Sequence, residues 1–575
     1  MGSTVTLADL LPPSFKDEYF KKLDADLEAI RAKKLTKTKE DQEISGLFGK
    51  FSDDVNKALI DVGIKENKTL AKVVKAGARG SPTQYRQTVF APVAVNDAKG
   101  RILTEFPIRK SFAEGLTLPE YLAHTFGARQ GAVATKLAVA EAGYFSKQMA
   151  RAGMTLKVEE ADCGTNNGIP VPIEDKDSVG CYLAKPAGGF NRNNEVTGKM
   201  LAALKDKGVT SIAVRSPITC EAPRHHHPGA ICQLCAGKRD KGLPPIGDYL
   251  GITASTTLGE PLSQGTLNTK HESGSARKAS TASGFKLINQ LANIPETFKG
   301  KAPLVKNDGT VTEVRKAPQG GHYVDVRDDN GSFEEYYVPE GFEVYVKAGQ
   351  KLEQGDVVSE GIINPAEVVQ LKGIGEGRRY FAETMKKAFD DSGLGGVNRR
   401  NFELLSKSQI DHVRITNPKG LGEFLPDQVV HYHALEKHYQ PRPDSKKVRV
   451  DHARGKYLET PELHYTIGTR LTSSMIDNLK KHGVESVTVH DDHPEFESEM
   501  QRIIDVPAFE QDWMHQLYST NLERRLVQAV NTGASSNLHG PSPVPGLAYG
   551  VGFGLNKTSE EDSIAEDEEE KLSFE

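Results

Sequence analysis

The stretch from Leu118 to about Met154 constrains the fold of this chain more than any other. It is rich in alanine, and after Pro119 it contains no further proline. Alanine favours helix more than any other residue and proline ends helices, so the stretch predicts one long helix. Glycines 127, 131 and 143 lie inside it, and we expect them to loosen the helix locally. On these residues alone, an ordinary buried core helix is the simplest interpretation.

The composition indicates several soluble domains. A chain of 575 residues has room for about four domains, and with 37% hydrophobic and 26% charged residues it contains no long apolar run. We therefore expect no transmembrane helix. The N-terminus lacks a basic segment followed by an apolar core, so we expect no secretory signal. Five cysteines in so long a chain argue for a reducing compartment rather than a disulfide framework.

The net charge of -5 is concentrated at the C-terminus. Residues 558–575 contain nine acidic residues and one lysine, which predicts a disordered acidic tail. The remaining chain carries about three net positive charges, too few to identify a nucleic-acid-binding protein. Binding to a polyanion would have to come from local basic patches or from partner chains.

Four of the five cysteines have the spacing of a metal site. Cys232 and Cys235 form a Cys-x-x-Cys turn, Cys220 precedes it by twelve positions, and Cys163 lies in the turn-rich sequence ADCGTNNG. Structural zinc takes four soft ligands in a tetrahedron, and a Cys-x-x-Cys turn supplies two of them. The four residues therefore predict a zinc site.

Other interpretations of these cysteines remain open. Cys232 and Cys235 can be a reduced or redox-active pair instead of metal ligands. One of the histidines 225–227 can replace a cysteine as a ligand. Cys181 lies outside the spacing and is expected to be a small buried residue.

The run from Gly247 to Gly274 is predicted to be helical in two halves. The first half is expected to end near a Gly-Glu-Pro sequence, and the second carries Gln264, Leu267, Asn268 and His271 at helical spacings of three and four. One face thus offers two amides, an apolar side chain and an imidazole, a set suited to binding a nucleotide. A solvated polar face is the alternative. The following SGSARKASTASG is small and polar, so this element can fold and unfold.

These motifs together resemble the C-terminal half of the beta-prime subunit of multi-subunit DNA-directed RNA polymerases. The run from Gly247 to Gly274 resembles the trigger loop, and FGARQGAVATKLAVAEAGYFSKQMARAG resembles the bridge helix. The order of Asp-Cys-Gly-Thr, Ser-Pro-x-Thr-Cys and Cys-x-x-Cys is similar to that of the family's structural zinc site, although the segment between Cys220 and Cys232 is longer than usual. The resemblance covers residues 65 to 430 well and weakens beyond them.

The resemblance extends to a basic loop before the long helix. Gly77-Ala78-Arg79-Gly80-Ser81 and Gln84-Tyr85-Arg86-Gln87 match a family segment closely. This implies that Arg79 contacts the triphosphate of the incoming nucleotide, a role that suits a guanidinium because it pairs bidentately with phosphate. Gln84 and Arg86 are implied in substrate binding as well, with Arg86 supporting the loop and the bridge helix. Without the resemblance, two arginines in a loop would be interpreted as surface charges.

The resemblance also assigns roles along the two helical motifs. In the bridge helix it points to Thr135, Ala142, Gly143 and Tyr144, where alanines give a slim face for a base pair and Gly143 is a flexing point. Some 24 helical residues span roughly 36 Å, enough to cross a nucleic-acid channel.

In the trigger loop the resemblance implies catalytic contacts with the incoming nucleotide. Leu267 would press on the base in place of the usual methionine, and Gln264 would contact the sugar. His271 would lie near the β-phosphate and either stabilise charge or donate a proton. Asn268 stands where the family usually has arginine, so we expect slower or less selective addition than in a typical cellular enzyme.

The family's catalytic magnesium is held by three aspartates, and this chain has no Asp-x-Asp-x-Asp run. We therefore expect one piece of a split beta-prime subunit, most like those of large bacteriophages. The implied partners are a beta-prime fragment with the aspartates and Mg²⁺, beta-like chains, a candidate specificity factor, DNA, RNA and nucleoside triphosphates, with no membrane. The expected location is the cytoplasm of an infected bacterium, or the virion.

The expected fold class is α+β and multidomain. It comprises a long bridge helix, a trigger helical hairpin, a zinc-bound turn region, a small β domain like a barrel-sandwich module, and further helical segments. The expected regions are helices at 1–65, a basic loop and strands at 66–115, the bridge helix at 116–155, zinc-binding turns at 156–245, the trigger loop at 246–298, the β domain at 299–365, a helical or mixed clamp- or jaw-like region at 366–505, a switch-like segment at 506–557 and the acidic tail at 558–575.

Three function classes compete. The first is a catalytic RNA polymerase subunit. The second is a nucleic-acid-binding relative that has lost its chemistry, which Asn268 favours mildly and which Arg79, Gln264 and His271 oppose. The third is a free zinc-binding structural protein.

Overall fold

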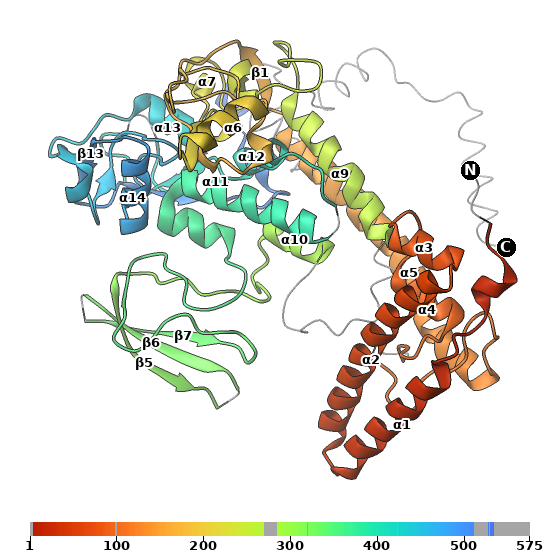
Figure 1. Ribbon diagram of the computed structural model, residues 1–575. Coiled ribbons are helices and arrows are strands. Elements are labelled where there is room, and N and C mark those ends of the chain that lie inside the picture. Colours follow the sequence, from red (N-terminus) through yellow and green to blue (C-terminus); the bar gives the residue numbers. More distant parts are fainter. Residues whose placement is uncertain are drawn as a thin grey trace. The chain divides into compact units, whose positions relative to one another are not determined.

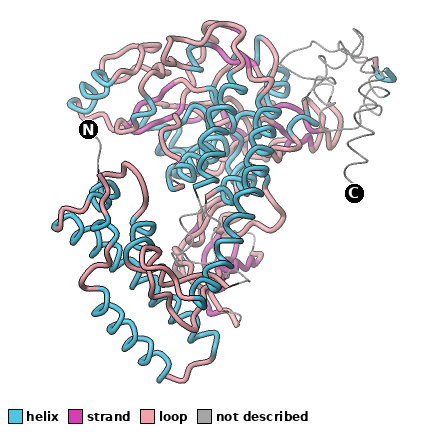
Figure 2. The backbone as a smooth tube through the Cα atoms, turned by 90° about the vertical axis from the view of Figure 1, so that its right-hand side faces the viewer, coloured by secondary structure: helices cyan, strands magenta, loops and turns pink. Residues whose placement is uncertain are grey.

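The computed structural model describes residues 4–97, 101–268, 284–318, 320–329, 331–392, 394–421, 424–510, 527 and 530–533 (Figure 1). Inside the helices, residues 38, 130, 131, 134, 135, 137–139 and 264–268 are described by their backbone alone. The described residues form two compact units. Unit 1 contains the chain up to Gly143 and the segment from Leu262 to Asn268, and unit 2 contains the rest. Short strands and many loops connect the helices (Figure 2).

Unit 1 is built around a helical hairpin within residues 1–65, the region in which helices are predicted. Its helices are α1 (Lys16–Ala32), α2 (Lys37–Lys65), α3 (Thr69–Lys75), α4 (Pro82–Val89) and the first part of α5 (Leu118–Gly153). Figure 1 shows α1 and α2 side by side, and the two helices contact each other. Apolar side chains recur every three or four residues along their shared face and are buried: Phe20, Leu23, Leu27, Ile44, Phe48, Phe51, Val55 and Leu59.

The segment 66–115 differs from its prediction as a loop with strands. It contains the helices α3 and α4, and its extended part forms isolated bridges, Val93 with Ile108 and Asn96 with Ile102. A capping box explains where α4 begins. The Ser81 hydroxyl accepts from the backbone N–H of Gln84, and the side-chain oxygen Oε1 of Gln84 accepts from the backbone N–H of Ser81. Pro82 at the first helical position completes this helix start.

The long helix predicted from Leu118 is confirmed. Helix α5 runs unbroken over 36 residues, from Leu118 to Gly153, and continues through Gly143. A Cβ added at Gly143 would meet no atom within 4 Å. The glycines therefore do not interrupt the helix in the structure, because glycine makes the same backbone hydrogen bonds and the surrounding alanines strongly favour helix.

The expectation that a helix ends at the Gly-Glu-Pro sequence is wrong. Helix α9 runs from Leu250 to Asn268 with Pro261 inside it. Proline deprives the carbonyl of Thr257 of a donor and costs roughly 3 kcal/mol inside a helix. Leu258 and Leu262 on either side are both buried, so packing outweighs this cost.

The described part of unit 2 contains five small sheets. Strand β1 (Lys157–Glu160) pairs in parallel with β4 (Ala230–Cys232), and β2 (Ile169–Pro172) pairs antiparallel with β3 (Ser211–Val214). The region predicted as a small β domain at 299–365 carries an antiparallel sheet in the order β7-β6-β5-β8. Its strands are β5 (Gly309–Lys316), β6 (His322–Asp328), β7 (Phe333–Val338) and β8 (Lys351–Leu352), with valines filling its core.

Two further sheets belong to the C-terminal part of unit 2. Their orders are β10-β9-β14 and β11-β13-β12. The strands are β9 (His412–Ile415), β10 (Val429–His431), β11 (Lys446–Arg449), β12 (Tyr457–Leu458), β13 (Ser486–His490) and β14 (Phe496–Glu499).

Besides the end of α5 and the first part of α9, the described part of unit 2 contains nine α-helices. They are α6 (Gly198–Asp206), α7 (Ala222–His225), α8 (Gln233–Ala236), α10 (Phe285–Asn293), α11 (Pro365–Asp391), α12 (Arg399–Gln409), α13 (Tyr432–His438), α14 (Ser473–Lys481) and α15 (Val506–Phe509). Helix α11 is kinked at Gly373, whose φ of +84° is non-helical. The region 366–505, predicted to be helical or mixed, begins with the helices α11 and α12 and continues with short strands and helices.

Two expectations concern the ends of the chain. The predicted switch-like segment and the acidic tail lie outside the described residues, apart from 506–510, 527 and 530–533.

Among the residues that the structure describes, no helix is both long and apolar enough to span a bilayer.

Candidate metal centre and nucleotide-binding segments

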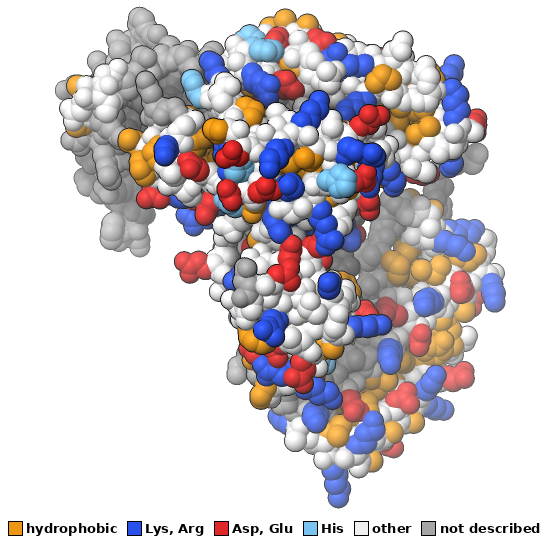
Figure 3. Space-filling view, turned by 90° about the vertical axis from the view of Figure 1, so that its left-hand side faces the viewer, with side chains coloured by type: hydrophobic (Ala, Val, Ile, Leu, Met, Phe, Trp, Pro, Cys, Tyr) orange, Lys and Arg blue, Asp and Glu red, His pale blue; other side chains and the backbone are white. Residues whose placement is uncertain are grey.

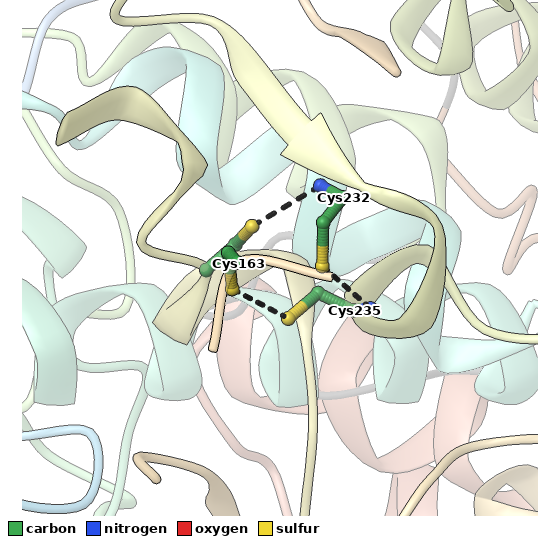
Figure 4. Close-up of side chains that lie close together, drawn as sticks. Cys163, Cys232 and Cys235 are labelled. Carbon is green, nitrogen blue, oxygen red and sulfur yellow. Dashed lines mark hydrogen bonds between the residues drawn. The ribbon is translucent and has the colours of Figure 1, made fainter. Parts of the chain in front are cut away.

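The structure brings together the four predicted cysteines. The sulfurs of Cys163, Cys220, Cys232 and Cys235 all lie within 4.8 Å of one another, and all four side chains are buried. The sulfurs of Cys163 and Cys235 are 3.8 Å apart (Figure 4). A tetrahedron with metal–sulfur bonds of about 2.3 Å has edges of about 3.8 Å, so the four sulfurs fit structural zinc.

Local backbone geometry directs these sulfurs inward. The Cys232 sulfur accepts from the N–H of Cys235 at 3.3 Å, which caps the short helix α8, and the Cys220 sulfur accepts from the N–H of Cys232 at 3.3 Å. Cys163 follows strand β1 in a turn where Asp162 accepts from the N–H of Gly164 at 2.9 Å. Parallel pairing of β1 with β4 holds these pieces together.

The other candidate ligands lie elsewhere. A nitrogen of His225 and one of His226 lie 3.2 and 3.5 Å from the carboxylate of Glu160, and His227 lies 3.2 Å from that of Glu159. Cys181 is buried outside the group, as expected, and burial raises the pKa of its thiol to about 11. The histidines therefore take no part in the cysteine group.

A buried arginine that the sequence did not identify contacts this group. Nη2 of Arg215 lies 3.2, 3.4 and 3.5 Å from the sulfurs of Cys163, Cys232 and Cys235. Nη1 of Arg215 lies 2.7 Å from a carboxylate oxygen of Asp162. Its only sequence signal is its position directly after the apolar strand β3, which places a long side chain beside the core.

Protonation and metal binding compete at the four thiols. Hydrogen bonds from the other three cysteines lower the pKa of Cys163, whereas burial raises the pKa of Cys220 and of Cys235. A metal ion binds thiolates, so loading of this group releases protons.

The predicted loop residues differ in their surroundings. Arg79 is exposed. Arg86 is buried, where its guanidinium donates to the Ser52 hydroxyl at 3.0 Å and to the Pro92 carbonyl at 2.9 Å. Burial lowers the pKa of Arg86 to about 10, so it stays charged at neutral pH. The side-chain oxygen of Gln84 caps α4. Arg79 is thus the exposed one of the three.

The predicted bridge-helix residues all lie on α5. Ala142 is buried, and Tyr144 is half exposed. Gly143 stands between them in the helix. Thr135 is described by its backbone alone.

The predicted trigger residues are described only in part. Gln264, Leu267 and Asn268 lie in the last turns of α9, with their backbone alone described. His271 lies outside the described residues.

Within unit 2, α9 packs directly on the end of α5. A Cβ added at Gly251 would stand 1.8 Å from the carbonyl oxygen of Gly153, so the two backbones touch. A Cβ at Gly259 would stand 2.6 Å from the hydroxyl oxygen of Ser146. The cysteine group belongs to the same hydrophobic cluster as Leu250 and Ala254 at the start of α9. This start is therefore held by both α5 and the cysteines.

Comparison with known proteins identifies the family. Residues 115–423 match the family model described as RNA polymerase Rpb1, domain 5, which is more than half of this 575-residue chain. The chain belongs to this family. The range that matches Rpb1 domain 5 includes α5, all four cysteines, α9, the β5–β8 sheet, α11 and α12.

Individual relatives are beta-prime subunits. The DNA-directed RNA polymerase subunit beta' of Desulforamulus reducens is 28% identical over 462 residues, which cover 75% of this chain and 38% of the relative. That of Caldanaerobacter subterraneus is 28% identical over 454 residues, covering 74% and 37%. That of Kineococcus radiotolerans is 27% identical over 464 residues, covering 75% and 34%. This Rpb1 domain 5 chain thus spans less than two fifths of the length of these relatives.

A buried charge network lies near the cysteines of this Rpb1 domain 5 chain. Arg378 pairs with Asp411 and also donates to the carbonyls of Ile410 and Ile218, at 2.6 and 3.1 Å. The side chains of Lys407, His431, His433 and Glu436 continue the network and are also buried. Sequence patterns do not identify such a network, because charged residues are ordinarily predicted on the surface.

The network predicts a loss of stability in alkali. Burial opposes charging of His431, but the carboxylates of Asp411 and Glu510, 3.6 and 3.7 Å from its ring nitrogens, outweigh it and raise its pKa to about 9 from an ordinary 6.5. A raised pKa stabilises the folded state below the unfolded value, and that contribution is lost as pH rises from 6.5 through 9. We expect the free energy of unfolding to fall by about 3 kcal/mol over this window.

Denaturant unfolding of the wild type and of His431→Gln between pH 6 and 10 measures this contribution. The difference in unfolding free energy between the two proteins should shrink with rising pH. A difference that stays constant over the whole range would contradict the assignment of the charge to His431.

Proposed function

We propose that this chain is the C-terminal part of a split beta-prime subunit of a multi-subunit DNA-directed RNA polymerase, most like those of large bacteriophages. The observation that carries the proposal is the family match over residues 115–423. The order of α5, the buried cysteines and α9 along the chain supports it. The reaction would be template-directed addition of nucleotides to RNA.

The proposed enzyme is active only as an assembly. A beta-prime fragment with the aspartate triad, beta-like chains and a candidate specificity factor would join this chain, with DNA, RNA and nucleoside triphosphates as nucleic acid and substrate. Mg²⁺ is expected on the aspartate fragment, where it would neutralise charge on the transferred phosphoryl group. The proposed location is the cytoplasm of an infected bacterium or the virion.

The four cysteines would hold structural Zn²⁺ through their thiolates. All four positions of the tetrahedron are filled by protein ligands, which leaves none open for a substrate. Because Leu250 and Ala254 pack in the same cluster, the metal centre would fix the start of α9. Its proposed role is thus to hold the trigger segment in place.

In the basic loop, one residue would bind the substrate and two others would hold the loop in position. Arg79 is exposed and is proposed to contact the triphosphate, since a guanidinium pairs bidentately with phosphate oxygens. Arg86 is buried against Ser52 and the Pro92 carbonyl, so it would position the loop. Gln84 would act beside them by fixing the start of α4.

Helices α5 and α9 would bracket the incoming nucleotide. Thr135, Ala142, Gly143 and Tyr144 are proposed to lie along the growing base pair, with Gly143 as the flexing point. In the trigger segment, Gln264 would contact the sugar and Leu267 the base, and Asn268 would stand in place of the family's arginine. His271 is proposed to act at the β-phosphate, as a proton donor or a stabiliser of charge.

Co-purification tests the assembly. A tagged version of this chain is recovered from its source cells, and every accompanying protein is identified by mass spectrometry. Recovery of a chain with an Asp-x-Asp-x-Asp loop together with beta-like chains is expected. Recovery of this chain alone would contradict the proposal and favour the catalytically inactive, nucleic-acid-binding relative.

A substitution tests the chemistry. In the assembled enzyme, His271→Ala is expected to slow single-nucleotide addition by about 100-fold, because a positioned proton donor contributes at least that much. Rapid-quench measurement of RNA extension gives the rate. The control is His452→Ala, which removes an exposed imidazole of unit 2 and should leave the rate unchanged. Equal rates for both variants would remove His271 from the mechanism.

A further inference from the structure

We infer that Arg215 is a permanent part of the metal centre, where it donates hydrogen bonds to three of the four metal-binding sulfurs and retains the metal. This inference rests on the proposed occupation of the cysteine group by a divalent metal. Nothing in the cysteine spacing or in the family match assigns this residue.

The contacts show that one nitrogen serves three sulfurs. Nη2 lies 3.2 Å from Cys163, 3.4 Å from Cys232 and 3.5 Å from Cys235. These distances are ordinary for N–H donors to sulfur, which is larger than oxygen. The nitrogen thus lies against the triangular face that these three sulfurs form, outside the tetrahedron.

The backbone N–H and Nη1 of Arg215 are also held by partners, whereas its buried Nε has no hydrogen-bond partner in the part of the chain that the structure describes. Its backbone N–H donates to the carbonyl of Tyr182 at 2.7 Å. Nη1 donates to the side-chain oxygen of Asn193 at 2.9 Å and pairs with Asp162 at 2.7 Å. The side chain is fully buried, whereas that of Asp162 is 37% exposed. The guanidinium is therefore preorganised toward the sulfurs and cannot leave without breaking several bonds.

The charge of the metal centre explains why a cation is placed beside it. Four thiolates around a divalent cation carry two net negative charges, and burying uncompensated charge is costly. The guanidinium of Arg215 places one positive charge directly against three of the sulfurs. Hydrogen bonds to a thiolate also withdraw electron density from sulfur, so the ligand becomes less reactive toward protons, oxidants and competing chelators.

An ion pair with Asp162 alone does not explain the geometry. That pair uses Nη1, while Nη2 is directed at the sulfurs. A lysine in this position would present a single ammonium group, which cannot hold the carboxylate and span three sulfurs in a fixed plane. The structure therefore predicts that arginine, and not positive charge alone, is needed.

The test uses the full chain with Arg215→Met, which keeps an unbranched side chain and removes the donors. Extraction of zinc by a chromogenic chelator is expected to be about 10- to 100-fold faster than in the wild type, the usual effect of removing an outer-shell partner. In the cobalt-loaded protein, the sulfur-to-metal charge-transfer band should move to lower energy, because sulfur regains electron density. A purely structural role would leave that band in place.

The matched control is Arg192→Met. Arg192 lies in the same neighbourhood and donates to the carbonyls of Gly164 and Thr165, but to no sulfur among the described residues. Its variant should keep the wild-type extraction rate and spectrum. Arg215→Lys, which keeps the charge, should fall between wild type and Arg215→Met and provides the comparison if the methionine variant does not fold.

The outcomes separate two failures. Wild-type protein without bound metal would overturn the proposed metal centre itself. A second outcome is that the wild type binds metal but the Arg215 variants that fold, Arg215→Lys and Arg215→Met, have the same extraction rate and the same cobalt spectrum as the wild type. This result would overturn the role of Arg215 without contradicting the metal centre. Equal losses in the Arg192 and Arg215 variants would overturn it too, since the effect would then be general to the region.

Discussion

Replacing Cys232 with serine is expected to abolish stoichiometric zinc and to unfold the region around the cysteines. Cys232 supplies one of the four sulfurs and also caps α8, so its loss removes a ligand and a helix start together. Structural zinc contributes roughly 10–16 kcal/mol of apparent binding free energy in small zinc domains. Losing even a third of this, about 3–5 kcal/mol, is comparable to the whole stability of a marginal domain.

Metal analysis and limited proteolysis of the purified chain measure this effect. We expect zinc near one equivalent in the wild type and near zero in Cys232→Ser, with new cleavage between residues 156 and 245. Cys181→Ala is the control, because Cys181 is equally buried but lies outside the group. Full zinc content in Cys232→Ser would refute the four-cysteine site, as would an equal loss in the control.

Asp411→Asn is expected to lower the free energy of unfolding of unit 2 by about 3–5 kcal/mol, the cost of leaving a buried charge without its partner. Although burial alone would raise the pKa of Asp411, Arg378 and the neighbouring His431 and His433 hold it well below its ordinary value. The amide keeps the shape of the carboxylate but removes its charge. Arg378 would then be a buried cation facing only carbonyl oxygens.

Urea denaturation compares this variant with Asp505→Asn. Asp505 pairs with Arg502 on the surface, where both side chains are a third or more exposed, so its loss should cost no more than about 1 kcal/mol. The double variant Asp411→Leu/Arg378→Met should be more stable than Asp411→Asn, because it leaves neither charge behind. Equal costs for the two single variants would show that the buried pair contributes nothing special.

The parts of the fold that the sequence predicts are those set by local physics. Alanine content predicts α5 to within a residue of Gly153, and the Cys-x-x-Cys spacing predicts which four sulfurs meet. Valine-rich segments with turn signals predict the strands around Val324. Each depends on residues close in sequence or on a ligand preference that is independent of the fold.

The parts that the sequence does not predict depend on distant contacts. Pro261 ends a helix by its own chemistry, and packing of Leu258 and Leu262 reverses that outcome. Arg215 is one of 73 basic residues, and its sulfur contacts arise only when β3 is placed beside the turn of Cys163. Asp411 and Arg378 are brought together across 33 positions of sequence. In each case, tertiary structure decides.

Charge on the surface likewise gives little warning of function. On the face drawn in Figure 3, acidic and basic side chains are interspersed among the described residues, in keeping with the small net charge of the body of the chain. Recognition of a nucleotide would therefore rest on single placed groups such as Arg79 rather than on a broad positive field.

The contact between Gly153 and Gly251 has a mechanical consequence. Most helix pairs meet through side chains, whose rotation absorbs small displacements, whereas here main chain touches main chain. Such a junction has no rotamers to adjust, so it behaves as a stiff coupling. A shift of the last turns of α5 would therefore be passed directly to the first turns of α9 within unit 2.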